Sequence, residues 1–204
     1  MIEAASVLAE GYAAVPPGHI AAIVTSLQMV APPAPRSGPA FPPGFALSSL
    51  TGTDPEAYRA LFLDVGADWL WFSRLGISDD ALAARLADPH VEVLALRRGA
   101  ANAGILELDF RQPGACELVY FGLVQGLLGQ GIGRALMNEA IGRAWARPIT
   151  RFWVHTCTLD HPGAVAFYTR SGFVPYAFHV EVAPDPRLTG ALPRHRAPQV
   201  PLLD

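Results

Sequence analysis

Three glycines at alternate positions, Gly129, Gly131 and Gly133, constrain the fold of this 204-residue chain more than any other feature. They follow an apolar segment typical of a strand (about Glu117 to Val124) and open a segment with the apolar spacing of a helix. Without side chains there, an anion can approach the first-turn N–H groups, where the helix dipole favours negative charge. Arg134 adds a cation beside them. The pattern predicts a strand–loop–helix unit that binds phosphate, and a tight turn without a ligand is the alternative.

The absence of lysine narrows the kind of phosphate site, because all 15 basic residues are arginines. A Walker A loop, a Schiff-base enzyme and a lysine-dependent serine acylase each require that amine. The dinucleotide pattern G-x-G-x-x-G does not fit either, since the third residue after Gly131 is Arg134 and the third after Gly133 is Leu136. We therefore expect backbone N–H groups, a helix N-terminus and arginine to hold the phosphate.

The overall composition indicates a soluble protein of one ordinary domain. A formal charge of −3 and a pI near 6.0 offer no basic surface to a nucleic acid. Two cysteines, Cys116 and Cys157, are too few for a disulfide scaffold. The sequence also shows neither a signal-peptide pattern nor an apolar run long enough to span a membrane. We expect a cytoplasmic protein without nucleic-acid or membrane partners.

Hydrophobic spacing over the rest of the chain predicts a layered α/β (or α+β) domain. Strands are expected at about residues 19–29, 91–96, 103–110, 151–158 and 174–182, and helices after Asp54–Pro55 and at about 78–87 and 162–170. The first helix is expected to carry one apolar stripe that extends to Trp69 and Phe72. Two proline-rich stretches, residues 31–44 and 184–201, are expected to lack regular structure.

Two motifs together resemble those of the GNAT acetyltransferases. The segment Leu128-Gly129-Gln130-Gly131-Ile132-Gly133 resembles the pattern Q/R-x-x-G-x-G/A, with Leu128 where glutamine or arginine is usual. The segment from His161 to Phe173 resembles N-x-x-A-x-x-F-Y-x-x-x-G-F, with His161 where asparagine is usual. The resemblance implies a mixed central sheet of about six to seven strands flanked by helices. It also implies one acetyltransferase domain over residues 1–184, and the prolines that follow indicate a C-terminal tail over residues 185–204.

The resemblance further implies acetyl-CoA as co-substrate, no metal, and direct transfer of the acetyl group to a primary amine of a small molecule or peptide. The coenzyme contacts that it carries over onto this chain are Phe121, Gly122, Leu123, Leu128, Gly129, Gln130, Gly131, Ile132, Gly133, Arg134 and His161. A catalytically idle acyl-CoA-binding module on the same fold stays an alternative, as does an acyltransferase that uses a longer acyl-CoA. A homodimer is also compatible with the sequence.

Glu117 and Tyr168 are the catalytic residues that the resemblance indicates. Glu117 stands at the distance from the glycine loop where histone-type members of the family have their base, and Tyr168 matches the tyrosine that acts as acid near the coenzyme sulfur. If its strand alternates regularly, Glu117 shares a face with Phe121, opposite Tyr120. Glu107 in the neighbouring strand is the substitute base.

Three further groups of residues have competing interpretations. His155 and Cys157 lie two apart on one strand, which would permit a covalent acyl-enzyme, although a buried thiol that only packs is commoner. The spacing of His155, Asp160 and His161 matches no zinc pattern. Trp71 lies off the stripe of the first helix, and we hypothesise that Trp71 or a neighbouring residue lines an apolar acceptor pocket.

Overall fold

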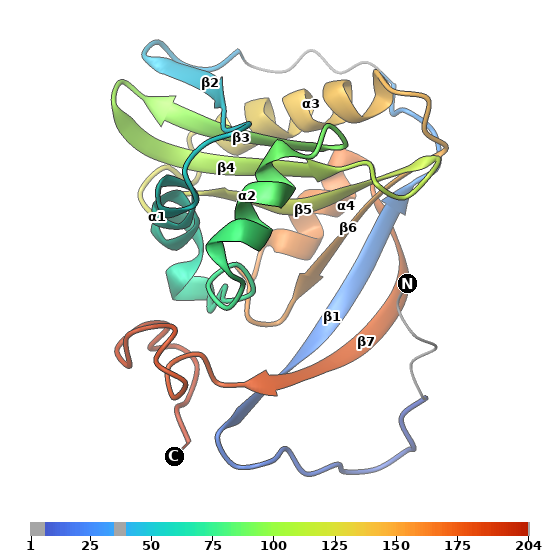
Figure 1. The fold of residues 1–204 in the computed structure, drawn as a ribbon. Helices are drawn as coiled ribbons and strands as arrows, with labels where there is room; N and C mark the ends of the chain where they lie inside the picture. Colours follow the sequence, from blue (N-terminus) through green and yellow to red (C-terminus); the bar gives the residue numbers. More distant parts are fainter. Residues whose placement is uncertain (1–6, 35–39, 204) are drawn as a thin grey trace.

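A seven-stranded mixed sheet organises the part of the chain that this computed structural model describes, residues 7–34 and 40–203. The strand order is β2-β3-β4-β5-β6-β1-β7, and β5 and β6 are the parallel pair in an otherwise antiparallel sheet (Figure 1). The strands are β1 (His19–Met29), β2 (Phe45–Ser49), β3 (Val91–Arg98), β4 (Ala101–Asp109), β5 (Ala115–Leu123), β6 (Arg151–Cys157) and β7 (Val174–Pro184). The expected layered architecture is confirmed, and β2 is a short strand that the sequence pattern did not predict.

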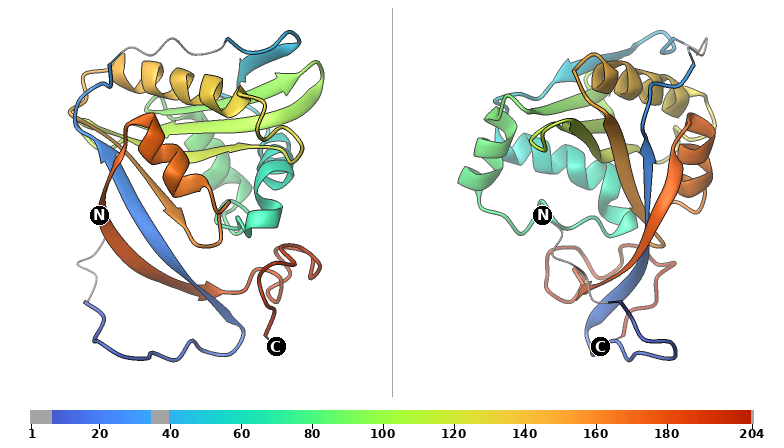
Figure 2. Two further views of the ribbon diagram at one scale, coloured as in Figure 1. Left: turned by 180° about the vertical axis from the view of Figure 1, so that it is seen from behind. Right: turned by 90° about the vertical axis from the view of Figure 1, so that its right-hand side faces the viewer.

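Helices cover both faces of the sheet (Figure 2). The helices are α1 (Pro55–Gly66), the 3-10 turn η1 (Ala67–Trp69), α2 (Asp79–Ala87), α3 (Ile132–Trp145) and α4 (Ala164–Ser171). Buried residues of α1 and α2 form one core cluster with β3 and β4, and residues of α3 and α4 form a second cluster on the other face. α1 begins as predicted, with Pro55 in its first turn and the Asp54 side chain accepting a hydrogen bond from the Glu56 N–H. In the described ranges, none of the helices is long and apolar enough to cross a membrane.

The first helix is shorter than its apolar stripe predicted. α1 ends at Gly66, Trp69 lies in η1, and Leu70 has a φ of 55° in the left-handed region. A side chain at Gly66 would collide with the indole of Trp71, since its Cβ would lie 2.3 Å from that ring. The helical path ends at the left-handed Leu70, after which the Trp71 N–H donates to the Gly66 carbonyl at 3.1 Å. Trp71 and Phe72 therefore belong to the connection between α1 and α2 instead of the helix.

β5 and β6 separate halfway along their length. Their paired residues run from Ala115 and Arg151 to Leu118 and Val154, and both strands continue beyond that point. β5 stays paired with β4 on its other side, and β6 with β1. The sheet therefore contains a gap whose edges present unpaired backbone N–H and C=O groups.

A bulge in β5 reverses the alternation of its side chains. The register with β4 shifts at Val119, which is one extra residue. Leu118 and Phe121 therefore both contact the core beneath α3 and α4, whereas Tyr120 packs on the α1 side. Glu117 consequently lies on the face of Tyr120. The prediction that it shares a face with Phe121 is wrong, because the bulge leaves no mark in the hydrophobic pattern.

The C-terminal segment, residues 185–203, packs against the connection between α1 and α2. Asp185 and Arg187 are almost completely buried and form an ion pair, with 2.7 Å between Oδ2 and Nη2. Gln199 Nε2 donates a hydrogen bond to the Asp68 carbonyl at 2.7 Å. The Arg187 guanidinium also donates to the carbonyl oxygens of Arg196, Ala197, Val200 and Pro201. The division into a domain over residues 1–184 and a tail stays a prediction, and part of the proline-rich loop at residues 31–44 lies outside the described residues.

We expect Arg187→Met to release the C-terminal segment. The change leaves the Asp185 carboxylate buried without its partner, which costs about 3–5 kcal/mol of unfolding free energy. Urea unfolding measures that loss, and cleavage by a broad-specificity protease, followed by mass spectrometry, locates the released segment.

The exposed Arg98 offers the control, Arg98→Met, which we expect to change neither measurement. Wild-type stability together with wild-type protease resistance in Arg187→Met would show that the buried ion pair does not hold the segment.

Candidate functional site

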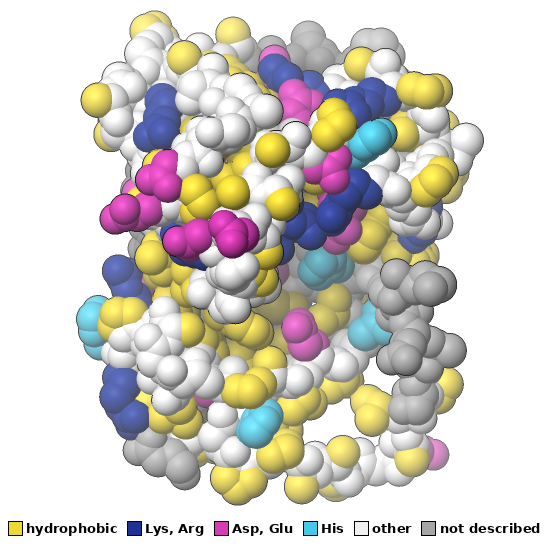
Figure 3. Space-filling view, viewed as in Figure 1, with side chains coloured by type: hydrophobic (Ala, Val, Ile, Leu, Met, Phe, Trp, Pro, Cys, Tyr) yellow, Lys and Arg dark blue, Asp and Glu magenta, His cyan; other side chains and the backbone are white. Residues whose placement is uncertain are grey.

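A cavity of about 660 Å³ opens where β5 and β6 separate. Its walls come from the ends of these strands, the glycine loop, α4, the connection between α1 and α2, and β7. The space-filling view is hollowed near its centre, where hydrophobic side chains gather together with histidine and acidic side chains (Figure 3). The cavity is therefore largely apolar, with a few polar groups that a ligand would meet.

The glycine loop forms one wall of the cavity. Gly129 and Gly131 have φ values of 77° and 79°, in the left-handed region that favours glycine. Gly131 is the N-cap of α3, and within the described chain the N–H groups of residues 129–133 donate no hydrogen bond. Arg134 lines the cavity beside them. Unpaired N–H groups, a helix N-terminus and a guanidinium together can bind a phosphate group.

The edge of β5 continues from this loop into the gap. The Val124 N–H donates to the Ala103 carbonyl of the neighbouring strand at 3.0 Å. Because successive residues of a strand direct their N–H groups to opposite sides, Leu123 and Phe121 direct theirs into the gap. The ring of Phe121 stacks on Phe167 of α4, with 5.6 Å between centroids. An extended ligand arm that carries amide groups can pair with this edge as another strand would.

Most of the predicted coenzyme contacts line the cavity. They are Phe121, Gly122, Leu123, Leu128, Gly129, Gly131, Gly133, Arg134 and His161. Gln130 and Ile132 do not: Gln130 Nε2 donates to the Gly126 carbonyl at 2.8 Å, and Ile132 is fully buried in the core. At His161, Nδ1 accepts a hydrogen bond from the Gly163 N–H at 3.0 Å.

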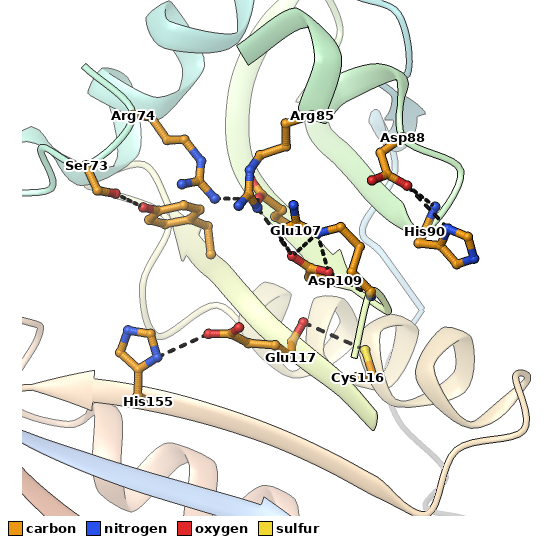
Figure 4. A network of polar contacts seen from close by, with 12 residues as sticks. Ser73, Arg74, Arg85, Asp88, His90, Glu107, Asp109, Cys116, Glu117 and His155 are labelled. Carbon is orange, nitrogen blue, oxygen red and sulfur yellow. Dashed lines mark hydrogen bonds and ion pairs between the residues drawn. The ribbon is translucent and has the colours of Figure 1, made fainter. Parts of the chain in front are cut away.

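The Glu117 carboxylate points toward His155 (Figure 4), and Glu117 itself does not line the cavity. Its Oε1 is 3.3 Å from His155 Nδ1. This contact raises the pKa of His155 above the ordinary value of 6.5, and the charges of Asp160 and Glu181 raise it further, against the opposing effect of burial. His155 does line the cavity, and no hydrogen bond to its Nε2 forms within the described chain. An imidazole held through Nδ1 in this way can take up a proton at Nε2.

Tyr168 of α4 reaches the cavity from the face opposite Glu117. Its side chain is largely buried, and its ring contacts Phe121 and Phe173 edge-on. Burial raises the pKa of the Tyr168 hydroxyl, and the charge of Asp160 adds to the increase. The hydroxyl therefore stays protonated at neutral pH, so it can donate a proton or a hydrogen bond.

Glu107 is buried and belongs to a network of polar contacts (Figure 4). It does not line the cavity. Tyr58 Oη donates to its Oε2 at 2.6 Å, and Arg74 Nη2 lies 2.7 Å from its Oε1. The Arg74 guanidinium also lies 4.8 Å from the centroid of the Tyr120 ring, which does line the cavity. Glu107 thus fixes α1 and the segment after it against β4, and its geometry gives no support to the substitute-base interpretation.

Both cysteines have weakly nucleophilic thiols. Burial and the nearby Asp160 raise the pKa of Cys157 to about 11, and burial raises the pKa of Cys116 as well. Thiolates, not neutral thiols, attack acyl groups, so the covalent route gains no support. Within the described ranges, no three or more His, Cys, Asp or Glu side chains are placed to hold a metal ion.

Several residues of this site were not predicted from the sequence. Asp160 accepts hydrogen bonds from Trp71 Nε1 at 3.1 Å and from Thr156 Oγ1 at 2.8 Å. Glu181 lines the cavity from β7, far along the chain from the two motifs. The spacing of His155 and Cys157 placed the two residues on one face of a strand. No local sequence pattern indicates that His155 contacts Glu117. Trp71 lines the cavity, as its hypothesis required.

Several solved structures share this fold. A GCN5-related N-acetyltransferase from Sphaerobacter thermophilus is 17% identical, with a TM-score of 0.58 over 83% of this chain and 52% of that one. A GCN5-related N-acetyltransferase from Kribbella flavida is 18% identical, with a TM-score of 0.51 over 85% and 63%. This chain thus spans about half to two thirds of their lengths.

A third similar structure is shorter. It is an aminoglycoside acetyltransferase from an uncultured soil metagenomic sample, in complex with sisomicin, and it is 14% identical with a TM-score of 0.53. The match covers 63% of this chain and 88% of that one. Among curated protein sequences, no match to this chain is found.

The family model described as Acetyltransferase (GNAT) family matches residues 58–173, which is more than half of the chain and includes both motifs. The chain therefore belongs to the GNAT acetyltransferase family.

Proposed function

We propose that this chain is an acetyl-CoA-dependent N-acetyltransferase that acts on a primary amine by direct attack. The observation that carries the proposal is the continuity between the glycine loop, with its unpaired N–H groups, and the open edge of β5. In this proposal acetyl-CoA supplies a thioester, whose carbonyl carbon the amine attacks as the carbon–sulfur bond breaks. The residues of the chain bind the two substrates and move the protons.

The glycine loop and Arg134 hold the diphosphate of the coenzyme. The N–H groups of Phe121 and Leu123 hold the amides of the pantetheine arm, so that the thioester lies between the ends of β5 and β6. His161 lies beside this path, where its imidazole can contact the arm.

His155 is the base in this proposal, and Glu117 positions it. The sequence indicated Glu117 as the base. The His155 imidazole lines the cavity, whereas Glu117 contacts that imidazole and does not line the cavity. A carboxylate behind Nδ1 fixes the tautomer and stabilises the imidazolium that forms when Nε2 accepts the proton. Tyr168 is the acid, and its hydroxyl delivers a proton to the departing thiolate.

The role of the glycine loop in coenzyme binding can be tested with two matched glycine-to-valine substitutions. Gly129 and Gly190 both have left-handed backbone, at φ of 77° and 82°, and a Cβ at either meets nothing within 4 Å. We expect Gly129→Val to raise the acetyl-CoA Kd about tenfold or more, because the side chain occupies the space of the bound anion. Isothermal titration calorimetry measures it.

Gly190→Val, in the C-terminal segment, introduces the same backbone strain outside the cavity, and we expect it to leave the Kd unchanged. Equal Kd values for both variants and the wild type would place the coenzyme somewhere else.

The proton relay can be tested by its pH dependence. Because protonated His155 accepts no proton, kcat/KM should rise with pH through the raised pKa of that histidine. Glu117→Gln removes the contact that raises this pKa, so the rising limb should move to lower pH. His155→Gln should lower kcat/KM by about 10²–10⁴. One amine serves for all variants, so its own titration is common to them.

His90 supplies the control, since it pairs with Asp88 outside the cavity, at 3.4 Å. His90→Gln should keep the wild-type profile. Undiminished turnover in His155→Gln, or an unmoved limb in Glu117→Gln, would remove this assignment and leave the coenzyme site standing.

The role of Tyr168 as a proton donor can be tested by Tyr168→Phe, which removes only the hydroxyl oxygen. We expect Tyr168→Phe to lower kcat by about 10²–10⁴ with an unchanged Kd for acetyl-CoA, because the ring still packs while the proton donor is gone. Thiol release measures kcat. Tyr176→Phe is the matched control, on an exposed tyrosine of β7, and should behave as wild type. A wild-type kcat in Tyr168→Phe would show that the thiolate obtains its proton elsewhere.

A further inference from the structure

We propose that the amine acceptor has an aromatic body and no carboxylate group, a class that 2-phenylethylamine represents. The inference rests on the proposed acetyl transfer, because it names the substrate class of the same cavity. It is carried by the distribution of charge and of aromatic surface along the cavity walls.

Negative charge gathers around His155. Asp160 and Glu181 line the cavity there, and Glu117 lies behind the imidazole. The lining arginines of the described chain are Arg134 of α3 and Arg170 of α4, and the whole sequence has no lysine. The carboxylates around the proposed base therefore attract an ammonium group and repel an acceptor that carries its own carboxylate.

An aromatic wall faces the same part of the cavity. It consists of Trp69, Trp71, Phe72 and Tyr120, and Leu159 adds aliphatic surface. The Trp71 and Tyr120 rings lie 5.0 Å apart between centroids. Aromatic rings bury large areas and prefer offset or edge-to-face contacts with other rings, and their faces attract cations. The wall therefore suits an aromatic group attached close to an ammonium.

Trp71 is fixed in position before any acceptor binds. Its Nε1 donates to Asp160 Oδ1, which links the aromatic wall directly to the acidic group. Two glycines make room for its ring: a Cβ at Gly66 would lie 2.3 Å from the indole, and one at Gly122 would lie 3.3 Å from it. A wall that is already ordered loses little conformational entropy on binding, so its area contributes to affinity.

Other amines fit this wall less well. An amino acid would place its carboxylate near Asp160 and Glu181, whose negative charges repel it. A polyamine such as spermidine would satisfy the acidic groups but would leave the indole of Trp71 and the ring of Phe72 in contact with water. Both classes are informative competitors in a test.

The test compares kcat/KM for four amines by thiol release from acetyl-CoA. They are 2-phenylethylamine, phenylalanine, 2-(2-aminoethoxy)ethanol and spermidine, so that a carboxylate is added or the ring is removed. We expect kcat/KM for phenylalanine to be lower than kcat/KM for 2-phenylethylamine by about 100-fold or more, because the acidic side chains repel the carboxylate of phenylalanine. For the two amines without a ring, kcat/KM should be about 10- to 200-fold lower than for 2-phenylethylamine, because they lack the apolar contact with the aromatic wall.

Two substitutions separate the aromatic and the acidic contributions. Trp71→Ala should raise KM for 2-phenylethylamine about tenfold and KM for 2-(2-aminoethoxy)ethanol by much less, because only the first amine loses an aromatic contact. Phe178→Ala removes an exposed aromatic ring of β7 outside the cavity and should change neither. Glu181→Gln, at an exposed position that carries little risk to folding, should raise KM for both amines, whereas Glu56→Gln on α1 should not.

Acetyl-CoA binding is measured by calorimetry on the same preparations. Binding together with a kcat/KM for phenylalanine or spermidine that equals or exceeds that of 2-phenylethylamine would overturn this inference alone. An equal rise in KM for 2-phenylethylamine and 2-(2-aminoethoxy)ethanol in Trp71→Ala would also overturn it. Absence of acetyl-CoA binding would overturn the proposed function, and this inference with it.

Discussion

The separation of β5 from β6 after Leu118 and Val154 is the constraint on which the rest of the site depends. Where parallel strands are paired, their backbone N–H and C=O groups form hydrogen bonds with each other. A gap between them therefore leaves a row of donors and acceptors for a ligand. The crossover helix α3 begins directly beyond that gap, and its unpaired N–H groups face the same cavity. One break in the sheet thereby joins a strand edge to a helix N-terminus.

The opposite side of the cavity depends on contacts between distant parts of the chain. Arg74 and Glu107 form a buried pair that holds the chain after η1 against β4, and Arg74 covers the ring of Tyr120. The C-terminal segment contacts Asp68 from the other side, through Gln199 and Arg196. The aromatic wall therefore lies between two buried arginine-centred clusters, one at Arg74 and one at Arg187. Such support lets large side chains keep one position around an open cavity.

The sequence predicted the fold where local signals are strong. The alternate glycines, the Asp54–Pro55 start of α1 and the periodicity of the strands each describe a few adjacent residues, and local physics determines them. The bulge at Val119 and the end of α1 at Gly66 were missed, because tertiary packing of Tyr120 and Trp71 decides them. Glu117 and His155 are in contact although they lie on different strands and are 38 positions apart in the sequence. No spacing rule reports such a pair, which explains why the sequence assigned the base role to the carboxylate alone.

In the proposed function, the gap between β5 and β6 and the glycine loop form one continuous coenzyme site. A crystal structure of the full chain grown with coenzyme A tests it most directly. We expect the diphosphate at the N–H groups of residues 129–133 beside Arg134, the pantetheine arm along Phe121 and Leu123, and the sulfur between the ends of β5 and β6. Coenzyme bound on another surface, with the edges of the gap still unpaired or occupied only by water, would rule out this coenzyme site.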